Sequence, residues 1–166
     1  MQQETVFDEY ATYPNYPKRY AVNLVNVRLV KEKRIGYLDK EIKMPDTAVK
    51  IAMNLLNEAD REHFLVMFMD VKQKINGVQI ISMGTISEVL APPREVFKGA
   101  ILAGASGIIC VHNHPSGDVT PSESDKLICQ NLIKAGKLLS IPVLDFIIVG
   151  PGGEFFSFKR HSDLIF

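Results

Sequence analysis

Residues 107–125 read GIICVHNHPSGDVTPSESD, and this stretch joins an apolar run to a short polar loop. The run Gly107–Val111 has no polar alternation, which predicts a strand that is covered on both faces, as in the sheets of α/β proteins. The loop begins directly at the end of that strand. In α/β folds this is the position where ligands bind, so the stretch indicates both a fold class and the place of a site.

A helix is expected to follow the loop. Thr120 is placed as its N-cap, and Glu123, three residues later, completes the pattern of a capping box. The helix is expected to continue to about Ala135 and to stop at Gly136.

The rest of the chain alternates strand and helix patterns. The predicted strands are Ala21–Val30, His63–Met69, Ile75–Met83, Val143–Val149 and Glu154–Phe158, and the predicted helices are Asp46–Ala59, with Asp46 as its cap, and Pro93–Gly104. This alternation predicts an α/β fold with a mixed β-sheet and helices on its faces.

Composition and charge exclude several classes of protein. The chain has 166 residues, which is enough for one domain with a proper core. Nineteen basic and 19 acidic residues leave no net charge to attract nucleic acid or an anionic membrane.

The start of the chain has no secretory pattern, and the two cysteines form no CxxC pair. These features favour reduced thiols and a cytoplasmic protein.

The first 19 residues differ from the rest, because tyrosines and prolines alternate in them. Prolines disfavour both helix and ladder pairing, so residues 1–19 are predicted to form a flexible N-terminal arm and residues 20–166 the domain. The alternative is that the tyrosines dock on a partner or on the domain itself.

Two histidines and one aspartate form a candidate metal site. His112 and His114 are two residues apart, and in an extended chain such side chains point to the same side. Asp125 lies one turn into the following helix, where its carboxylate can face back to the strand end. Two imidazoles and one carboxylate with an open fourth position are typical of a catalytic zinc.

Hydrolysis at such a zinc also needs a base that is not itself a ligand. Glu62 is the preferred candidate, because it directly precedes the buried strand that begins at His63. Three further carboxylates are also candidates: Glu88, Glu95 and Asp118. Ser122 is a candidate either for stabilising an oxyanion or for orienting a ligand.

The spacing matches the JAMM pattern H-x-H-x7-S-x-x-D at every defined position, through His112, His114, Ser122 and Asp125. The fuller string HNHPSG…PSESD, followed by KAGKLLSIPVLDFIIVG, resembles the RadC family of the JAB/MPN metalloprotease superfamily. The likeness runs from about Asp46 to Phe158.

The resemblance implies a cytidine deaminase-like fold and a zinc ion held by His112, His114 and Asp125. It implies Glu62 as acid/base and Ser122 as a stabiliser of the tetrahedral intermediate. It also implies a helix-hairpin-helix-like domain, for which the stretch before Asp46 is too short.

The expected activity is zinc-dependent hydrolysis of an amide or isopeptide bond in a peptide or protein substrate. The alternative is a DNA repair or recombination accessory protein without hydrolytic activity, and a third hypothesis is a binding module with a purely structural zinc. Only the basic residues near Lys18 and Lys31–Arg34 favour nucleic acid. The sequence does not decide the oligomeric state.

Overall fold

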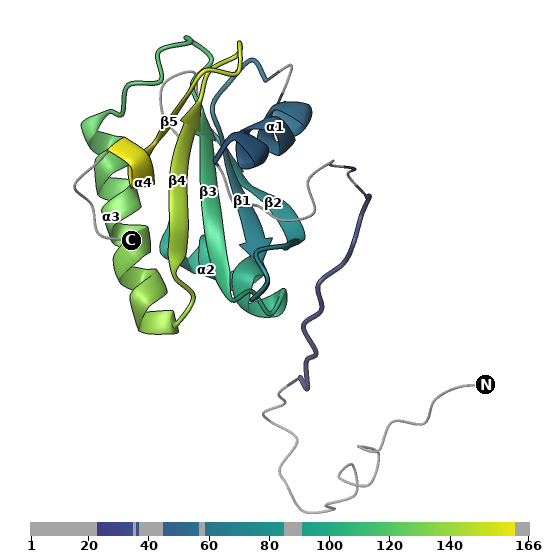
Figure 1. Ribbon diagram of the computed structural model, residues 1–166. Helices are drawn as coiled ribbons and strands as arrows, with labels where there is room; N and C mark the ends of the chain where they lie inside the picture. Colours follow the sequence, from purple (N-terminus) through teal and green to yellow (C-terminus); the bar gives the residue numbers. More distant parts are fainter. Residues whose placement is uncertain (1–22, 35, 37–44, 57–58, 85–90, 162–166) are drawn as a thin grey trace, which may run out of the picture.

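The computed structural model describes residues 23–34, 36, 45–56, 59–84 and 91–161 (Figure 1). Its elements are α1 (Pro45–Leu56), β1 (His63–Met69), β2 (Ile75–Met83), α2 (Pro93–Leu102), β3 (Gly107–Asn113), α3 (Glu123–Leu139), β4 (Val143–Val149), β5 (Phe155–Ser157) and α4 (Phe158–His161). No helix in these ranges has the length and hydropathy to cross a membrane.

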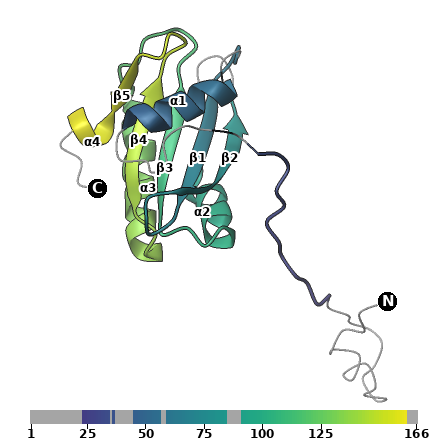
Figure 2. The same ribbon diagram turned by 45° about the vertical axis from the view of Figure 1, so that its right-hand side comes forward.

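The strands form one mixed sheet in the order β2-β1-β3-β4-β5. β3 and β4 are parallel, and the other neighbouring strands are antiparallel. Figure 2 shows α1 on one face of the sheet and α2 and α3 on the other. The predicted α/β class is therefore confirmed.

Two hydrophobic cores, one on each face, explain why β1 is apolar from Phe64 to its end at Met69. Phe64, Val66 and Phe68 belong to the core under α2 and α3. Leu65 and Met67 belong to the core under α1. A strand that lies inside a sheet covered on both sides has no face left for polar residues.

The start of α3 corrects one prediction. The N-cap is Ser122 rather than Thr120, and its partner in the capping box is Asp125 rather than Glu123. The pattern of a capping box fits both registers. In the structure the backbone N–H of Thr120 donates to Oδ1 of Asp118 at 2.9 Å, so the donor that Glu123 would accept from in the predicted box is already used.

The predicted end of α3 at Gly136 is also wrong. The helix continues through Gly136 to Leu139, and Ser140 closes it in the left-handed conformation with φ of 57°. Gly136 is needed for close packing instead of termination, since a Cβ there would lie 2.6 Å from the carbonyl oxygen of Ile141.

Three smaller predictions shift in their bounds. α1 begins at Pro45, so Asp46 lies in its first turn instead of capping it, and the described helix ends at Leu56. α2 ends at Leu102, two residues before the predicted Gly104. β5 stops at Ser157, because Phe158 begins the four-residue helix α4.

The strand predicted over Ala21–Val30 is wrong for residues 23–30, which are exposed and pair with no described strand. Alternating apolar residues suit one face of a sheet, but a strand forms only where a neighbour offers its backbone groups. The predicted arm over residues 1–19 lies outside the described residues.

Candidate metal centre

The site lies where the end of β3 meets the start of β1. The two strands are antiparallel, and their last pair on this side is Phe64 opposite His112. Glu62 directly precedes β1 and is separated from Phe64 by His63 alone, so it is brought beside His112. The loop after β3 then returns the chain to the start of α3.

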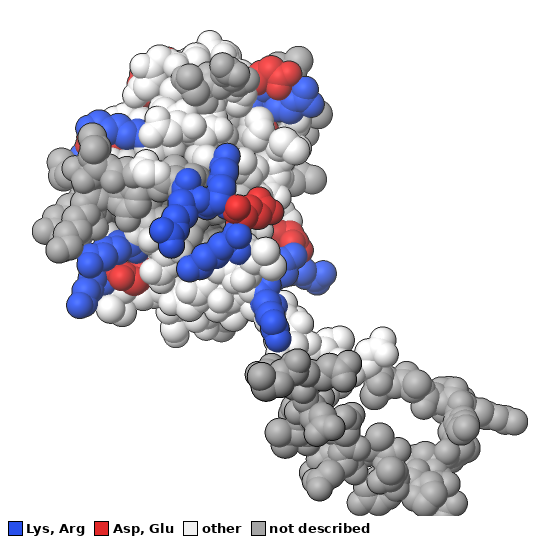
Figure 3. Space-filling model, turned by 90° about the vertical axis from the view of Figure 1, so that its right-hand side faces the viewer, with Lys and Arg blue, Asp and Glu red and all other residues white. Residues whose placement is uncertain are grey.

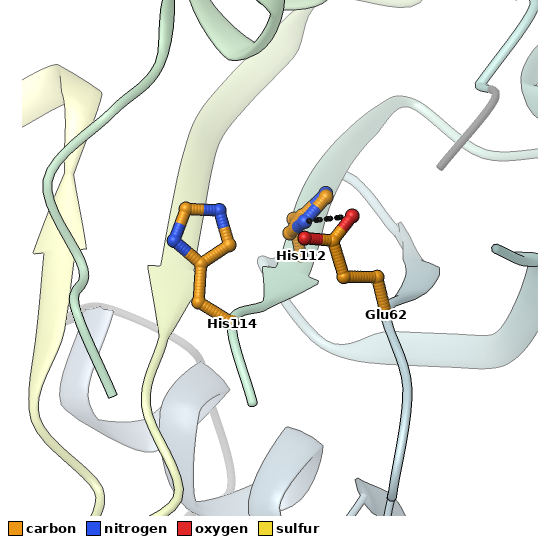
Figure 4. A group of neighbouring side chains, drawn as sticks. All are labelled: Glu62, His112 and His114. Atoms are coloured by element: carbon orange, nitrogen blue, oxygen red, sulfur yellow. Dashed lines mark ion pairs between the residues drawn. The ribbon is translucent and has the colours of Figure 1, made fainter. Parts of the chain in front are cut away.

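Glu62, His112 and His114 form a cluster in which one candidate ligand atom from each lies within 4.8 Å of the others. The Nε2 atom of His112 is 3.6 Å from Oε2 of Glu62. Figure 4 shows these two side chains pointing toward one another. The ring centroids of His112 and His114 are 4.9 Å apart, which confirms that the two imidazoles share one side of the chain.

Asp125 reaches the same place from the first turn of α3. Its Oδ2 is 3.6 Å from Nε2 of His114, and its Oδ1 is 3.9 Å from Nδ1 of His112. The side chain is buried. The structure thus brings all three predicted ligands together, with Glu62 on the opposite side of His112.

The orientation of His114 is fixed by its other ring nitrogen. Its Nδ1 lies 2.6 Å from the carbonyl oxygen of Asp118, to which it donates when protonated there. Its backbone N–H donates to Val149 of β4 at 2.8 Å. Metal-binding histidines are commonly oriented by such an outer hydrogen bond, which leaves the Nε2 lone pair directed at the site.

His112 is buried, with 2 % of its surface exposed, and both its ring nitrogens lack a hydrogen-bond partner among the described residues. Burial lowers the pKa of His112 to about 4, so the ring is neutral at physiological pH. An unpaired buried polar atom is costly, and a neutral imidazole is the form that binds a metal ion. These residues therefore fit a metal.

Ser122 contacts Asp125 and holds its carboxylate. The Ser122 hydroxyl donates to Oδ2 of Asp125 at 2.5 Å, and the Ser122 backbone N–H donates to the same oxygen at 2.8 Å. Burial raises the pKa of Asp125, but hydrogen bonds with His114 and Ser122 outweigh it and hold the pKa at about 2. The same Asp125 carboxylate raises the pKa of His114.

Two of the three other candidate bases, Glu95 and Asp118, are described and lie outside the cluster. Glu95 is on the surface of α2 and pairs with Lys98. Asp118 is exposed and its carboxylate bonds to the loop backbone, and Glu88 lies outside the described residues. Glu62 is the candidate that the structure places beside the histidines, with 8 % of its surface exposed.

One residue of the histidine motif was not predicted to matter. Asn113, between the two histidines, is buried and its side chain bonds to the backbone on both sides of Glu62. Only its alternate direction in the strand could be read from the sequence. Its partners are about fifty residues away and depend on the pairing of β1 with β3.

The two cysteines take no part in the cluster. Cys110 and Cys129 are free and buried in the core under α2 and α3. Burial raises the pKa of the Cys110 thiol, as expected for a core residue rather than a ligand.

The comparisons with known proteins all point to one protein family. Residues 42–163 match the family model described as RadC-like JAB domain. Among similar proteins, a UPF0758 protein of Caldanaerobacter subterraneus is 44% identical over 65% of this chain and 46% of its own length. A UPF0758 protein of Desulforamulus reducens is 42% identical over 73% of this chain and 53% of its own length. The chain spans about half the length of the curated relatives it matches.

Proposed function

This chain belongs to the RadC-like JAB domain family, and from that membership and the cluster at the end of β3 we propose that it is a zinc-dependent hydrolase of amide bonds. The proposed ligands are His112, His114 and Asp125. The proposed acid/base is Glu62. The proposed substrate class is a peptide or protein with a peptide or isopeptide bond.

The unpartnered ring of His112 is the observation that best supports this proposal. A buried histidine that serves packing alone normally satisfies at least one nitrogen. Here neither ring nitrogen has a hydrogen bond among the described residues, while a second imidazole and two carboxylates converge on the same space. Two nitrogens and a carboxylate oxygen are the donor set of many catalytic zinc sites.

Each residue has a definable task. Zinc, when bound, supplies a Lewis acid that polarises a carbonyl and lowers the pKa of water to about 7. Glu62 can accept a proton at its carboxylate and deliver it to the leaving nitrogen. Because the Ser122 hydroxyl is donated to Asp125, orienting that ligand is the task that suits Ser122 better than stabilising an oxyanion.

The structure also offers Glu62 as the third ligand in place of Asp125, since Glu62 is the carboxylate within 4.8 Å in the cluster. Substitution distinguishes the two assignments. As an acid/base, Glu62→Gln retains zinc and loses at least a hundredfold in turnover of a peptide or isopeptide substrate. As a ligand, the same change releases zinc.

A role with nucleic acid is the second candidate, and it rests on exposed positive charge. Arg28, Lys31, Lys33 and Arg34 are all exposed. Figure 3 shows Lys and Arg side chains gathered on one face, with acidic side chains among them. If these exposed basic residues bind DNA, the affinity must fall steeply with salt, because bound cations are released from the duplex. A flat salt dependence would reject this candidate.

A further inference from the structure

Asn113 makes two hydrogen bonds that enclose Glu62. Its Oδ1 accepts from the backbone N–H of His63 at 2.6 Å. Its Nδ2 donates to the carbonyl oxygen of Arg61 at 3.1 Å. The Glu62 carbonyl is held separately, by the backbone N–H of Gly84 at 2.8 Å. The backbone is therefore restrained before, at and after the glutamate.

The strand pairing explains why a side chain is needed here. The ladder between β1 and β3 ends at Phe64 and His112, so the backbone at residues 61–63 has no strand partner on that side. The side-chain amide of Asn113 offers a C=O acceptor and an N–H donor, as a backbone peptide does, and it replaces two ladder hydrogen bonds. Without it, the segment that carries Glu62 would be free to fray from the sheet.

The alternation along His112, Asn113 and His114 links this restraint to the site. The two histidines point into the cluster, and Asn113 points to the Glu62 segment. One tripeptide thus supplies two candidate ligands and bonds to the backbone on both sides of the residue whose carboxylate faces them.

We propose that Asn113 is a positioning residue, which holds the Glu62 carboxylate beside His112 by clamping the backbone at Arg61 and His63. The inference rests on the proposed function for its catalytic meaning, but the clamp itself is a property of the fold.

The test uses the full chain loaded with cobalt(II), whose visible absorption reports the surroundings of the metal without a substrate. The variants are Glu62→Gln, Asn113→Ala and Asn113→Asp. The matched control is Ser106→Ala, because Ser106 makes a side-chain bond to Met69 at the other end of the same strand pair, far from Glu62. Amide hydrogen exchange at His63 is measured by NMR on the metal-free proteins.

Asn113→Ala is expected to accelerate exchange at His63 at least tenfold and to shift the cobalt bands in the same direction as Glu62→Gln. Asn113→Asp keeps the acceptor for His63 and loses the donor to Arg61, so it should fall between wild type and Asn113→Ala. Ser106→Ala should leave both readouts unchanged.

Unchanged exchange at His63 in Asn113→Ala would overturn the clamp. Faster exchange with unshifted cobalt bands would overturn the positioning role while leaving the clamp. Equal effects of Ser106→Ala and Asn113→Ala would assign both to general stability. Failure of the wild type to bind cobalt would instead contradict the proposed function, and the exchange measurement would still decide the clamp.

Discussion

At the scale of single residues, the most informative side chain is His112, because it is buried and its ring has no hydrogen bond within the part of the chain that the structure describes. Burial of a group that can be charged links its protonation to stability. In the metal-free chain, His112 is therefore a source of acid sensitivity as well as a candidate ligand.

The pKa of His112 is about 4 in the folded chain, below its ordinary value of 6.5. The unfolded chain therefore binds a proton that the folded chain rejects between these values. The contribution of the neutral ring is fully present above pH 6.5 and is lost as the pH falls toward 4. The loss is on the order of 3 kcal/mol over this window.

We expect His112→Asn to remove this sensitivity, because asparagine does not titrate. The measurement is urea unfolding in a chelator at several pH values from 7.5 to 4, with wild type as the reference. Between pH 6.5 and pH 4, the difference in unfolding free energy between the two proteins should change by about 3 kcal/mol. A difference that stays constant with pH would show that His112 is not buried in its neutral form.

The sequence predicts the members of the cluster at this scale better than their supports. His112 and His114 follow from strand alternation, and Asp125 follows from helix geometry, because all three relations are local. The bonds from Asn113 to Arg61 and His63 join parts of the chain far apart in sequence. Spacing alone could not reveal them.

At the scale of elements, α3 is tied to the site by its first turn. Ser122 caps the helix and holds the Asp125 carboxylate at the same time. Stability of the helix and orientation of a candidate ligand thus depend on one side chain.

Ser122→Ala should destabilise the chain by about 1 kcal/mol, the usual cost of losing an N-cap. Thr120→Ala is the matched control and should cost less than half of that, since the Thr120 side chain bonds to the exposed Asp118 carboxylate and does not cap α3. Urea unfolding of the metal-free proteins provides the comparison. If Thr120→Ala costs more than Ser122→Ala, the observed capping register is contradicted.

The elements also show where local patterns suffice. The strands His63–Met69, Ile75–Met83 and Val143–Val149 have the predicted bounds, because their apolar runs end in clear turns. The start of α3 differs from the predicted residue, since two overlapping capping patterns compete there. The end of α3 also differs, since the need for a glycine at residue 136 arises from packing on Ile141.

At the scale of the whole molecule, the folded unit and the preceding segment are distinct in burial. Residues 23–34 are all exposed, whereas the family match begins at residue 42. A chain that begins at Gly36 should therefore unfold within about 0.5 kcal/mol of the full chain. Urea unfolding of both lengths tests this. A loss above about 2 kcal/mol would mean that the removed segment packs on the domain.

The sequence indicates the α/β class through the alternation of its elements, but not the order of the strands. The site depends on that order. β1 lies between β2 and β3 and runs antiparallel to β3, which is what places Glu62 next to His112. The sequence therefore favours Glu62 only by its place before a buried strand, and its closeness to His112 follows from the strand order alone.

The central claim is that the buried cluster at the end of β3 holds a zinc ion through His112, His114 and Asp125. The direct test is zinc content per chain of the untagged protein, measured for wild type, His112→Ala and Asp125→Ala. His161→Ala is the control, because His161 is exposed and lies on α4, outside the cluster.

We expect one zinc per folded chain in the wild type and in His161→Ala, and none in the two site variants, with the fold retained in all four. A wild type that takes up no zinc when it is supplied, or a His112→Ala variant that keeps its zinc, would contradict a zinc site at these residues.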